Sequence, residues 1–184
     1  MKSLIFLLVL ANTFAYSQKS ISERLSQKEA KAKTITYLID ASYATQDRTG
    51  SMIFVNNVKN EWINKPTNYY YKGAFRSCIS TKEDDIKWSK EMKKAIKSAF
   101  TKNRLEELQK ERLEISIAFS SQGKPLGVRF FIETLELTKL TLEELEDIET
   151  AIMRDIKFTF KCQEKIVNYN YIPFSWIYNF KDFL

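Results

Sequence analysis

Residues 113–133, LEISIAFSSQGKPLGVRFFIE, constrain the fold more than any other stretch of the chain. Apolar and polar residues alternate through 113–120, stop at a turn of residues 121–125 and alternate again through 126–133, which is the period of a β-strand. Gly123 can adopt the positive φ that such a turn requires. The pattern predicts a β-hairpin with one face on the core. The residues expected on that face are Leu113, Ile115, Ile117, Phe119, Leu126, Val128, Phe130 and Ile132.

A helix after the hairpin is expected to cover the apolar face of this antiparallel sheet. Thr141 and Glu144 have the spacing of a capping box, and Leu140 with Leu145 have that of a hydrophobic staple. Apolar residues then recur at intervals of three and four, as on one side of a helix. They are Leu145, Ile148, Ile152 and Ile156.

The segments KFTFK and KIVNYNYIPF, which follow this helix, return to alternation and predict a third strand. Val167, Tyr169 and Tyr171 would lie on one side of it. Proline cannot donate to a strand ladder, so Pro173 indicates that the strand ends near there or lies at a sheet edge. The aromatic tail FSWIYNFKDFL is expected to pack back on the sheet, since an exposed tail would form an apolar patch typical of an interface.

The N-terminal half, residues 18–112, is expected to be mainly helical. Ser26 and Glu29 have capping-box spacing and apolar residues follow at three and four, which predicts a helix over 26–44. The segment TITYLI within it is rich in β-branched residues and could be a strand instead. The apolar run SMIFVNN, at 51–57, predicts a short strand.

Two helices are predicted before the hairpin. Thr81 can cap the first, which has acidic residues in its first turn and lysines later, as the helix dipole favours. A shorter helix is expected over 102–111. The apolar residues expected on the buried side of the first helix are Trp88, Met92, Ala95, Ile96, Ala99 and Phe100.

Residues 1–17, MKSLIFLLVLANTFAYS, predict a secretory signal peptide. Lys2 precedes an apolar run from Leu4 to Ala11, small residues follow, and cleavage is expected before Gln18. The run is shorter than the roughly 20 residues of a bilayer span, although an uncleaved anchor is the alternative. We expect an exported protein, periplasmic or secreted, with no transmembrane segment after cleavage.

The chain contains no histidine, which removes Ser-His-Asp and Cys-His catalysis and His-ligated metals. The common phosphate-binding loops and the nucleophile elbow are also missing. The adjacent carboxylates Asp84–Asp85, Glu106–Glu107 and Glu143–Glu144 are interpreted as solvated helix faces, because neighbours on a helix do not face each other. We therefore expect a protein that is not an enzyme and uses no cofactor and no metal.

Cys78 and Cys162 are the two cysteines. In an oxidising compartment they could form one disulfide bond, whereas two separately buried thiols are the alternative. Two cysteines without histidine do not make a structural zinc site.

Aromatic and basic residues supply the candidate binding surface. The net charge of +6 and the lysines of the helix after Thr81 suit an anionic polymer, and aromatic residues beside amides suit a peptide or carbohydrate groove. An irregular connection packed over the core is the alternative interpretation of the tyrosine-rich segment 61–80. The export signal argues against nucleic acid. The candidate residues are Tyr69, Tyr70, Tyr71, Lys93, Lys97, Tyr169, Tyr171 and Trp176.

Residues 113–174 resemble the C-terminal domain of TonB and its relatives. The likeness lies in the order of strand, turn with glycine, strand, capped helix, aromatic-basic stretch and strand, read as ISIAFSSQGKPLGVRFFI, TLEELEDIETAIMRDIKFTF and VNYNYIPF. It implies that an open sheet edge can accept a partner's strand. The Tyr-Pro motif and the Pro-rich linker of TonB are missing, so no family residue is carried over and energy transduction is not expected. The whole chain also resembles uncharacterised exported proteins of the Bacteroidetes type.

These observations predict an α+β protein whose 184 residues suit one domain or two very small ones. A signal peptide (1–17) and a mainly helical half (18–112) would precede a TonB-like β-β-α-β unit with an aromatic tail (113–184). The function expected is binding of a protein or peptide in the cell envelope, by strand addition. Binding of an envelope glycan or an anionic polymer by the tyrosines and lysines is the alternative.

Overall fold

The computed structural model describes residues 19–24, 27–40, 51–64, 80–134 and 138–184. The predicted signal peptide, the three consecutive tyrosines and Cys78 lie outside these ranges.

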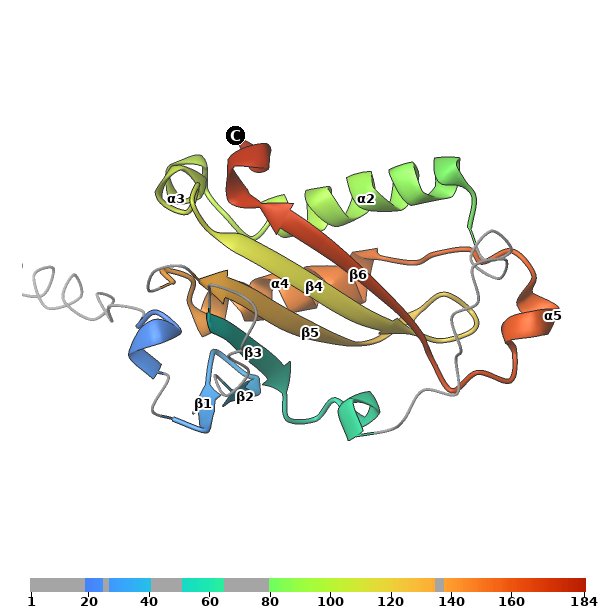
Figure 1. Ribbon diagram of the computed structural model, residues 1–184, viewed down its shortest axis with the longest axis horizontal. Helices are drawn as coiled ribbons and strands as arrows, with labels where there is room; N and C mark the ends of the chain where they lie inside the picture. Colours follow the sequence, from blue (N-terminus) through green and yellow to red (C-terminus); the bar gives the residue numbers. More distant parts are fainter. Residues whose placement is uncertain (1–18, 25–26, 41–50, 65–79, 135–137) are drawn as a thin grey trace, which may run out of the picture.

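The described strands form one antiparallel sheet of six strands in the order β1-β2-β3-β5-β4-β6 (Figure 1). β1 and β6 are therefore its two edges, and β3 joins the N-terminal strands to the hairpin through β5. The strands are β1 (Glu29–Lys31), β2 (Thr36–Asp40), β3 (Ser51–Asn57), β4 (Arg112–Phe119), β5 (Pro125–Thr134) and β6 (Ile172–Asn179).

Helices cover one face of the sheet. Figure 1 shows α4 passing behind β4 and β5, and α2 lies against α4 along the β6 side. In the described segments, no helix has the length and apolar character needed to cross a membrane. The helical elements are η2 (Ser22–Arg24), η3 (Glu61–Asn64), α2 (Lys82–Lys97), α3 (Lys102–Glu107), α4 (Leu142–Asp155), α5 (Gln163–Ile166) and η4 (Phe180–Phe183).

The hairpin prediction is confirmed as β4 and β5, with Gly123 at φ 75° in the turn. One predicted core residue is wrong. The register shifts so that Ala118 pairs with Gly127 and Phe119 with Pro125, which leaves Leu126 as an extra residue between the two pairs. A bulge of this kind turns the extra side chain out of the ladder, and Leu126 is 46% exposed.

The remaining core residues of the hairpin are fully buried and align in rows across the sheet. One row runs through Ile53, Ile132, Leu113 and Tyr178, and these side chains face the helix layer. The predicted stripe of α4 is buried against them, and its capping box at Thr141 is formed. The hairpin and its covering helix are thus confirmed.

The predicted helix over 26–44 is wrong, because β1 and β2 occupy its described part. Tyr37 and Ile39 are buried while Leu38 between them is exposed, which is the alternation of a strand. The turn between β1 and β2 is held by Glu146 of α4. Its carboxylate accepts hydrogen bonds from the backbone amides of Lys33, Thr34 and Ile35 and from the Thr34 hydroxyl. The N-terminal half is therefore not mainly helical.

The strand predicted at 51–57 is confirmed as β3, and the helix after Thr81 is confirmed as α2 with a Thr81–Asp84 capping box. The shorter helix, α3, ends at Glu107 rather than at 111. Glu111 instead accepts hydrogen bonds from the Thr138 hydroxyl and the Lys139 amide.

The third strand begins later than predicted. α5 and a turn occupy most of KIVNYNY, and β6 starts at Ile172, so Pro173 opens the strand instead of closing it. Its placement at a sheet edge is confirmed. The aromatic tail forms β6 and η4 and packs on the sheet as expected, through Tyr178, Phe180 and Phe183.

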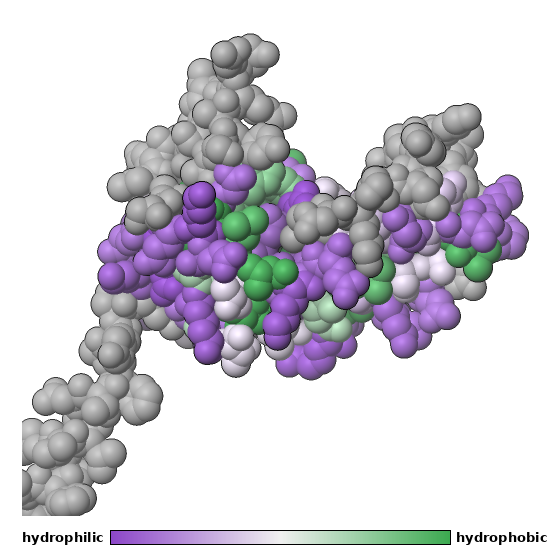
Figure 2. All heavy atoms as spheres, turned by 90° about the horizontal axis from the view of Figure 1, so that it is seen from below, coloured by the Kyte–Doolittle hydropathy of each residue, from purple (hydrophilic) through white to green (hydrophobic). Residues whose placement is uncertain are grey.

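The side seen from below in Figure 2 is mostly hydrophilic, and hydrophobic side chains reach its surface in small patches between charged ones. Hydrophobic residues that are substantially exposed are Leu38, Val58, Ile86, Leu126, Met153, Val167, Ile177 and Leu184. Ile177 is the member of this group that lies on β6.

Candidate protein-binding edge

The register of β4 and β6 fixes which backbone groups of β6 face outward. The Phe180 amide, just beyond β6, donates to the Glu111 carbonyl at 3.1 Å. Hydrogen-bonded and non-hydrogen-bonded pairs alternate along antiparallel strands. Residues an even number of positions before Phe180 therefore bond to β4, and the residues between them direct N–H and C=O away from the sheet. The outward donors are the amides of Ser175, Ile177 and Asn179.

Pro173 agrees with this phase. Pro173 lies opposite Ala118 and is one of the β6 residues whose backbone groups point away from β4. Its missing N–H would therefore have pointed to the open side of the edge. Proline is tolerated in edge strands at such positions because no ladder hydrogen bond is lost.

The outer side of β6 lacks the features that usually protect a sheet edge. Natural edges are shortened, charged or bulged, which prevents pairing with another chain. β6 has 8 residues, and none of them is charged. It pairs with β4 in one continuous register, without a bulge. Ser175 is exposed and Ile177 is 53% exposed. Within the described ranges, β6 pairs with β4 alone, and no backbone group forms a hydrogen bond with the outer side of β6.

Aromatic rings hold β6 against the helix layer. Phe174 stacks on Trp176 at 5.6 Å and on Phe160 at 5.8 Å between ring centroids. Trp88 of α2 meets Phe174 edge to face at 5.7 Å. Phe174 and Trp176 are half-buried, so both rings pack on the core while parts of them remain accessible.

A hollow of about 470 Å³ lies between the last turns of α2 and η4. Its lining consists of Lys93, Lys94, Lys97, Ser98, Asp182 and Phe183. The Lys97 ammonium donates to the Phe183 carbonyl at 2.8 Å, which ties η4 to α2. The Phe183 ring packs on Tyr178 of β6 at 5.9 Å, so the hollow borders the end of the β6 edge near Asn179.

The structure brings some of the predicted binding residues together and separates others. Lys93 and Lys97 line the same hollow, and Trp176 lies on the neighbouring strand. Tyr169 is half-buried against the core, while Tyr171 is buried with its ring 5.4 Å from that of Trp62. Tyr171 is only 8% exposed and offers little surface to a partner, so its part in binding stays a prediction. Tyr69, Tyr70 and Tyr71 lie outside the described residues.

Sequence reasoning missed Ser175 and Ile177, the centre of the open edge. The signal was present, since Ile172, Phe174, Trp176 and Tyr178 alternate with smaller or polar residues. Pro173 indicates a strand end or a sheet edge, and proline also fits the start of an edge strand.

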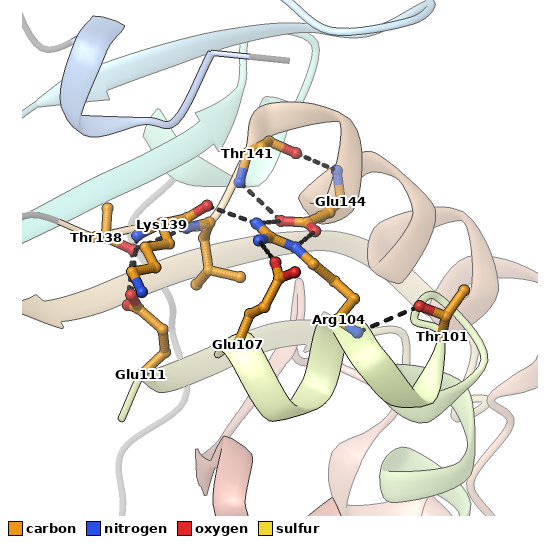
Figure 3. A network of polar contacts seen from close by, with 9 residues as sticks. Thr101, Arg104, Glu107, Glu111, Thr138, Lys139, Thr141 and Glu144 are labelled. Carbon is orange, nitrogen blue, oxygen red and sulfur yellow. Dashed lines mark hydrogen bonds and ion pairs between the residues drawn. The ribbon is translucent and has the colours of Figure 1, made fainter. Parts of the chain in front are cut away.

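The carboxylates of α4 are not a solvated face, which corrects the interpretation of Glu143–Glu144. Glu144 is only 8% exposed and accepts hydrogen bonds from Arg104 of α3 (Figure 3). Glu149 is buried as well. Its carboxylate accepts hydrogen bonds from the Tyr37 hydroxyl at 2.7 Å and from the side-chain amide of Asn57 at 3.0 Å. Burial raises the pKa of the Glu149 carboxyl, against the lowering effect of these two hydrogen bonds. These groups connect elements of the fold.

Cys162 is disulfide-bonded and has a positive φ of 56°. Cys78, the other cysteine of the chain, lies outside the described residues, so the Cys78–Cys162 pairing stays a prediction. Across the described segments, no group of three or more acidic or cysteine side chains could hold a metal ion.

Comparison with known proteins places the chain among relatives of unknown function. Residues 30–176 match the family described as Domain of unknown function (DUF5043). The fold is similar to that of a DUF5043 family protein from Bacteroides uniformis ATCC 8492, with a TM-score of 0.65 and 23% sequence identity over 82% of this chain and 84% of that chain. At this identity the likeness shows the fold alone. No curated protein matches.

These comparisons do not show the likeness to TonB. The resemblance to uncharacterised proteins of the Bacteroidetes type is consistent with them. Because the family match extends from β1 into β6, the chain belongs to the DUF5043 family.

Proposed function

We propose that this protein is an exported interaction module that binds an extended segment of another protein as an added strand on β6. The observation that carries the proposal is the uncharged, 8-residue edge strand with outward amides at Ser175, Ile177 and Asn179. Main-chain hydrogen bonds supply much of the affinity in such complexes, and alternate side chains supply specificity. This is the binding style that the resemblance to TonB implies.

The other edge of the sheet is much less suited to the same role. β1 has 3 residues, and short edge strands are one of the ways in which proteins prevent strand pairing. β6 offers a longer ladder on a strand that aromatic packing already holds in place, so little conformational entropy is lost in the protein when a partner pairs.

The proposal predicts two sets of contacts for the partner segment. Side chains on one side would lie next to Ile177, which faces the sheet surface opposite to the helices. Side chains on the other side would lie next to the exposed parts of Phe174 and Trp176. Because Ser175 shares the face of Ile177, the aromatic side is the more apolar one, and a segment with apolar residues at the alternate positions next to Phe174 and Trp176 fits the edge.

Substitution of Ile177 by proline tests strand addition directly. Because the Ile177 amide points outward, Ile177→Pro removes a donor for the partner and leaves the ladder to β4 intact, as Pro173 does naturally. Ile177→Thr is the matched control, since threonine keeps the amide and suits a strand. The probe is a fluorescein-labelled peptide of alternating valine and glutamate, roughly nine residues long.

Fluorescence anisotropy should report binding of this peptide to the wild type and to Ile177→Thr. We expect at least about a tenfold weaker affinity for Ile177→Pro, with an unchanged far-UV circular dichroism spectrum. Hydrogen exchange should become slower at Ser175, Ile177 and Asn179 when the peptide is bound. Equal affinity of the proline variant, or unchanged exchange at these amides, would refute strand addition at β6.

The same edge could instead pair with a second copy of the chain. Sedimentation of the wild type and of Ile177→Pro separates this outcome from the proposal. A dimer that the proline variant abolishes, combined with no peptide binding, would make the partner another molecule of this protein.

A further inference from the structure

We infer that the segment bound at β6 carries acidic side chains, and that the hollow between α2 and η4 receives them. This inference rests on the proposed function and adds the chemistry of the partner. It depends on the position of the hollow, on the charge around it and on its size.

The hollow continues the β6 edge. Its lining residue Phe183 packs on Tyr178, and the neighbouring lining residue Asp182 lies 3.4 Å from the Asn179 side-chain amide. α2 and β6 run side by side in the same direction, because Trp88 in the first half of α2 contacts Phe174 near the start of β6, and Lys97 at the end of α2 contacts Phe183 of η4, which follows β6. An added strand that extends past Asn179 therefore reaches the hollow.

The charge at this end of α2 is strongly positive. Lys90, Lys93, Lys94 and Lys97 are all exposed in the last two turns, and Glu91 is the acidic residue among them. In the part of the chain that the structure describes, neither Lys93 nor Lys94 forms an ion pair. Lys97 is engaged with the Phe183 carbonyl and keeps its positive charge.

Acidic groups near the hollow do not cancel this charge. Asp182 lies in the lining, and Asp155 of α4 is the carboxylate close enough for Lys94 to affect its titration. The pKa of Asp155 is lowered chiefly by its hydrogen bonds to Arg154, so Arg154 is its main partner. Lys93 follows Met92 of the buried stripe, and helical spacing places it about 100° around α2 from Lys94.

The size of the hollow suits side chains better than a polymer. A volume of about 470 Å³ is within the range of small-ligand pockets and can hold one or two carboxylate side chains. A long anionic polymer would need a track of positive charge, yet the first turn of α2 carries Glu83, Asp84 and Asp85. The observations therefore favour an acidic peptide segment.

The test compares two double variants with equal loss of charge. Lys93→Gln/Lys94→Gln removes charge from the hollow and keeps Lys97, whose hydrogen bond holds η4. Lys82→Gln/Lys87→Gln is the control, because these lysines lie on earlier turns of the same helix, close to or beyond a Debye length from the hollow. The probes are the valine–glutamate peptide and the corresponding valine–glutamine peptide.

We expect the hollow variant to bind the valine–glutamate peptide about five- to tenfold more weakly than the wild type, and the control variant to bind within about twofold. The valine–glutamine peptide should bind both variants alike. The salt dependence of binding should be smaller in the hollow variant, because screening acts on the lost contacts.

Other results overturn the inference in distinguishable ways. If Ile177→Pro abolishes binding but the hollow variant binds normally, strand addition stands and the acidic preference does not. If heparin binds the wild type, is lost in the hollow variant and is unaffected by Ile177→Pro, the lysines serve an anionic polymer and the peptide inference is wrong. If neither peptide binds at roughly 1 mM, both the proposed function and the inference fail.

Discussion

Replacement of Arg104 by methionine should destabilise the protein strongly, because Arg104 makes an ion pair with a buried carboxylate. Its guanidinium donates to both Glu144 carboxylate oxygens, with Nε–Oε1 at 2.6 Å, and to the Lys139 carbonyl at 2.7 Å. A third carboxylate contact goes to Glu107 at 2.7 Å (Figure 3). Arg104 therefore joins α3 to the N-terminus of α4.

The size of the stability loss depends on the interactions that Glu144 keeps when Arg104 is replaced. Glu144 is buried and keeps the hydrogen bond from the Thr141 amide at 2.9 Å, but loses its cation. Breaking a buried ion pair from one side typically costs about 3–5 kcal/mol. The Arg104 side chain is 26% exposed, so water can partly replace it, and its contact with the exposed Glu107 adds little. We expect a loss of about 2–4 kcal/mol in the free energy of unfolding.

Urea unfolding followed by far-UV circular dichroism measures this loss, with an unchanged m-value showing that the unfolded state is the same. Arg154→Met is the matched control, because Arg154 also makes two hydrogen bonds to one carboxylate, that of Asp155, but is 66% exposed. It should cost less than about 1 kcal/mol. Glu144→Gln in the Arg104→Met background should recover part of the loss by removing the uncompensated charge. If Arg104→Met costs no more than the control, the burial argument is wrong.

Three further predictions concern other parts of the structure. Burial raises the pKa of the Glu149 carboxyl, so as the pH rises from about 4.5 the unfolded chain loses this proton before the folded protein does, and the free energy of unfolding falls. In thermal melts, Glu149→Gln should therefore be more stable than the wild type at neutral pH but not below pH 4. Equal differences in stability at both pH values would contradict this. Gly127→Ala would bring a Cβ within 2.0 Å of the Trp62 Nε1 atom, and should cost about 1–3 kcal/mol in urea unfolding, with a shifted tryptophan emission; a change below about 0.5 kcal/mol would show that Trp62 moves freely. If Cys162 pairs with Cys78, Cys162→Ser should lose about 2–4 kcal/mol relative to the oxidised wild type and nothing relative to the reduced wild type, and a difference that persists in reductant would exclude this pairing as the cause.

Local patterns predicted the elements whose partners are near in sequence. The β4–β5 hairpin and α4 follow from alternation, a turn and a capping box within a few dozen residues. The prediction for Leu126 is wrong because the register shifts between Ala118 and Phe119, next to Gly127, where Trp62 of another segment packs closely. A period of two cannot reveal an extra residue that interrupts it.

The local residues of β1 and β2 left helix and strand open, since the TITYLI segment is rich in β-branched residues, whereas β3 was predicted from its apolar run. The turn between β1 and β2 is fixed by Glu146, 112 positions after Thr34 in the chain. Without that partner, the capping-box spacing of Ser26 and Glu29 favoured a helix. The hydrogen bonds from Glu146 fix the turn and so favour the strand that the β-branched residues of TITYLI also allow.

The same limit applies to the candidate site. Pro173 allowed the edge position of the last strand to be predicted, because proline restricts a strand wherever it occurs. The outward phase of Ser175 and Ile177 depends on the register with Glu111, more than sixty residues earlier. The sequence of Lys93 and Lys97 indicates only their charge, and the packing of η4 against α2 shows that they line a hollow.

The segment around Arg104 also links the scaffold to the proposed binding edge. Glu111 holds the loop before α4 through its carboxylate and the end of β6 through its carbonyl, which accepts from the Phe180 amide. Phe180 in turn packs edge to face on Phe100, between α2 and α3, at 5.3 Å. Arg104→Met weakens the global fold without touching the outward amides of β6. At temperatures where this variant remains folded, its affinity for the valine–glutamate peptide should stay within about twofold of the wild type. A large loss of affinity in the folded variant would mean that the contacts of Arg104 position the β6 edge as well as stabilising the fold.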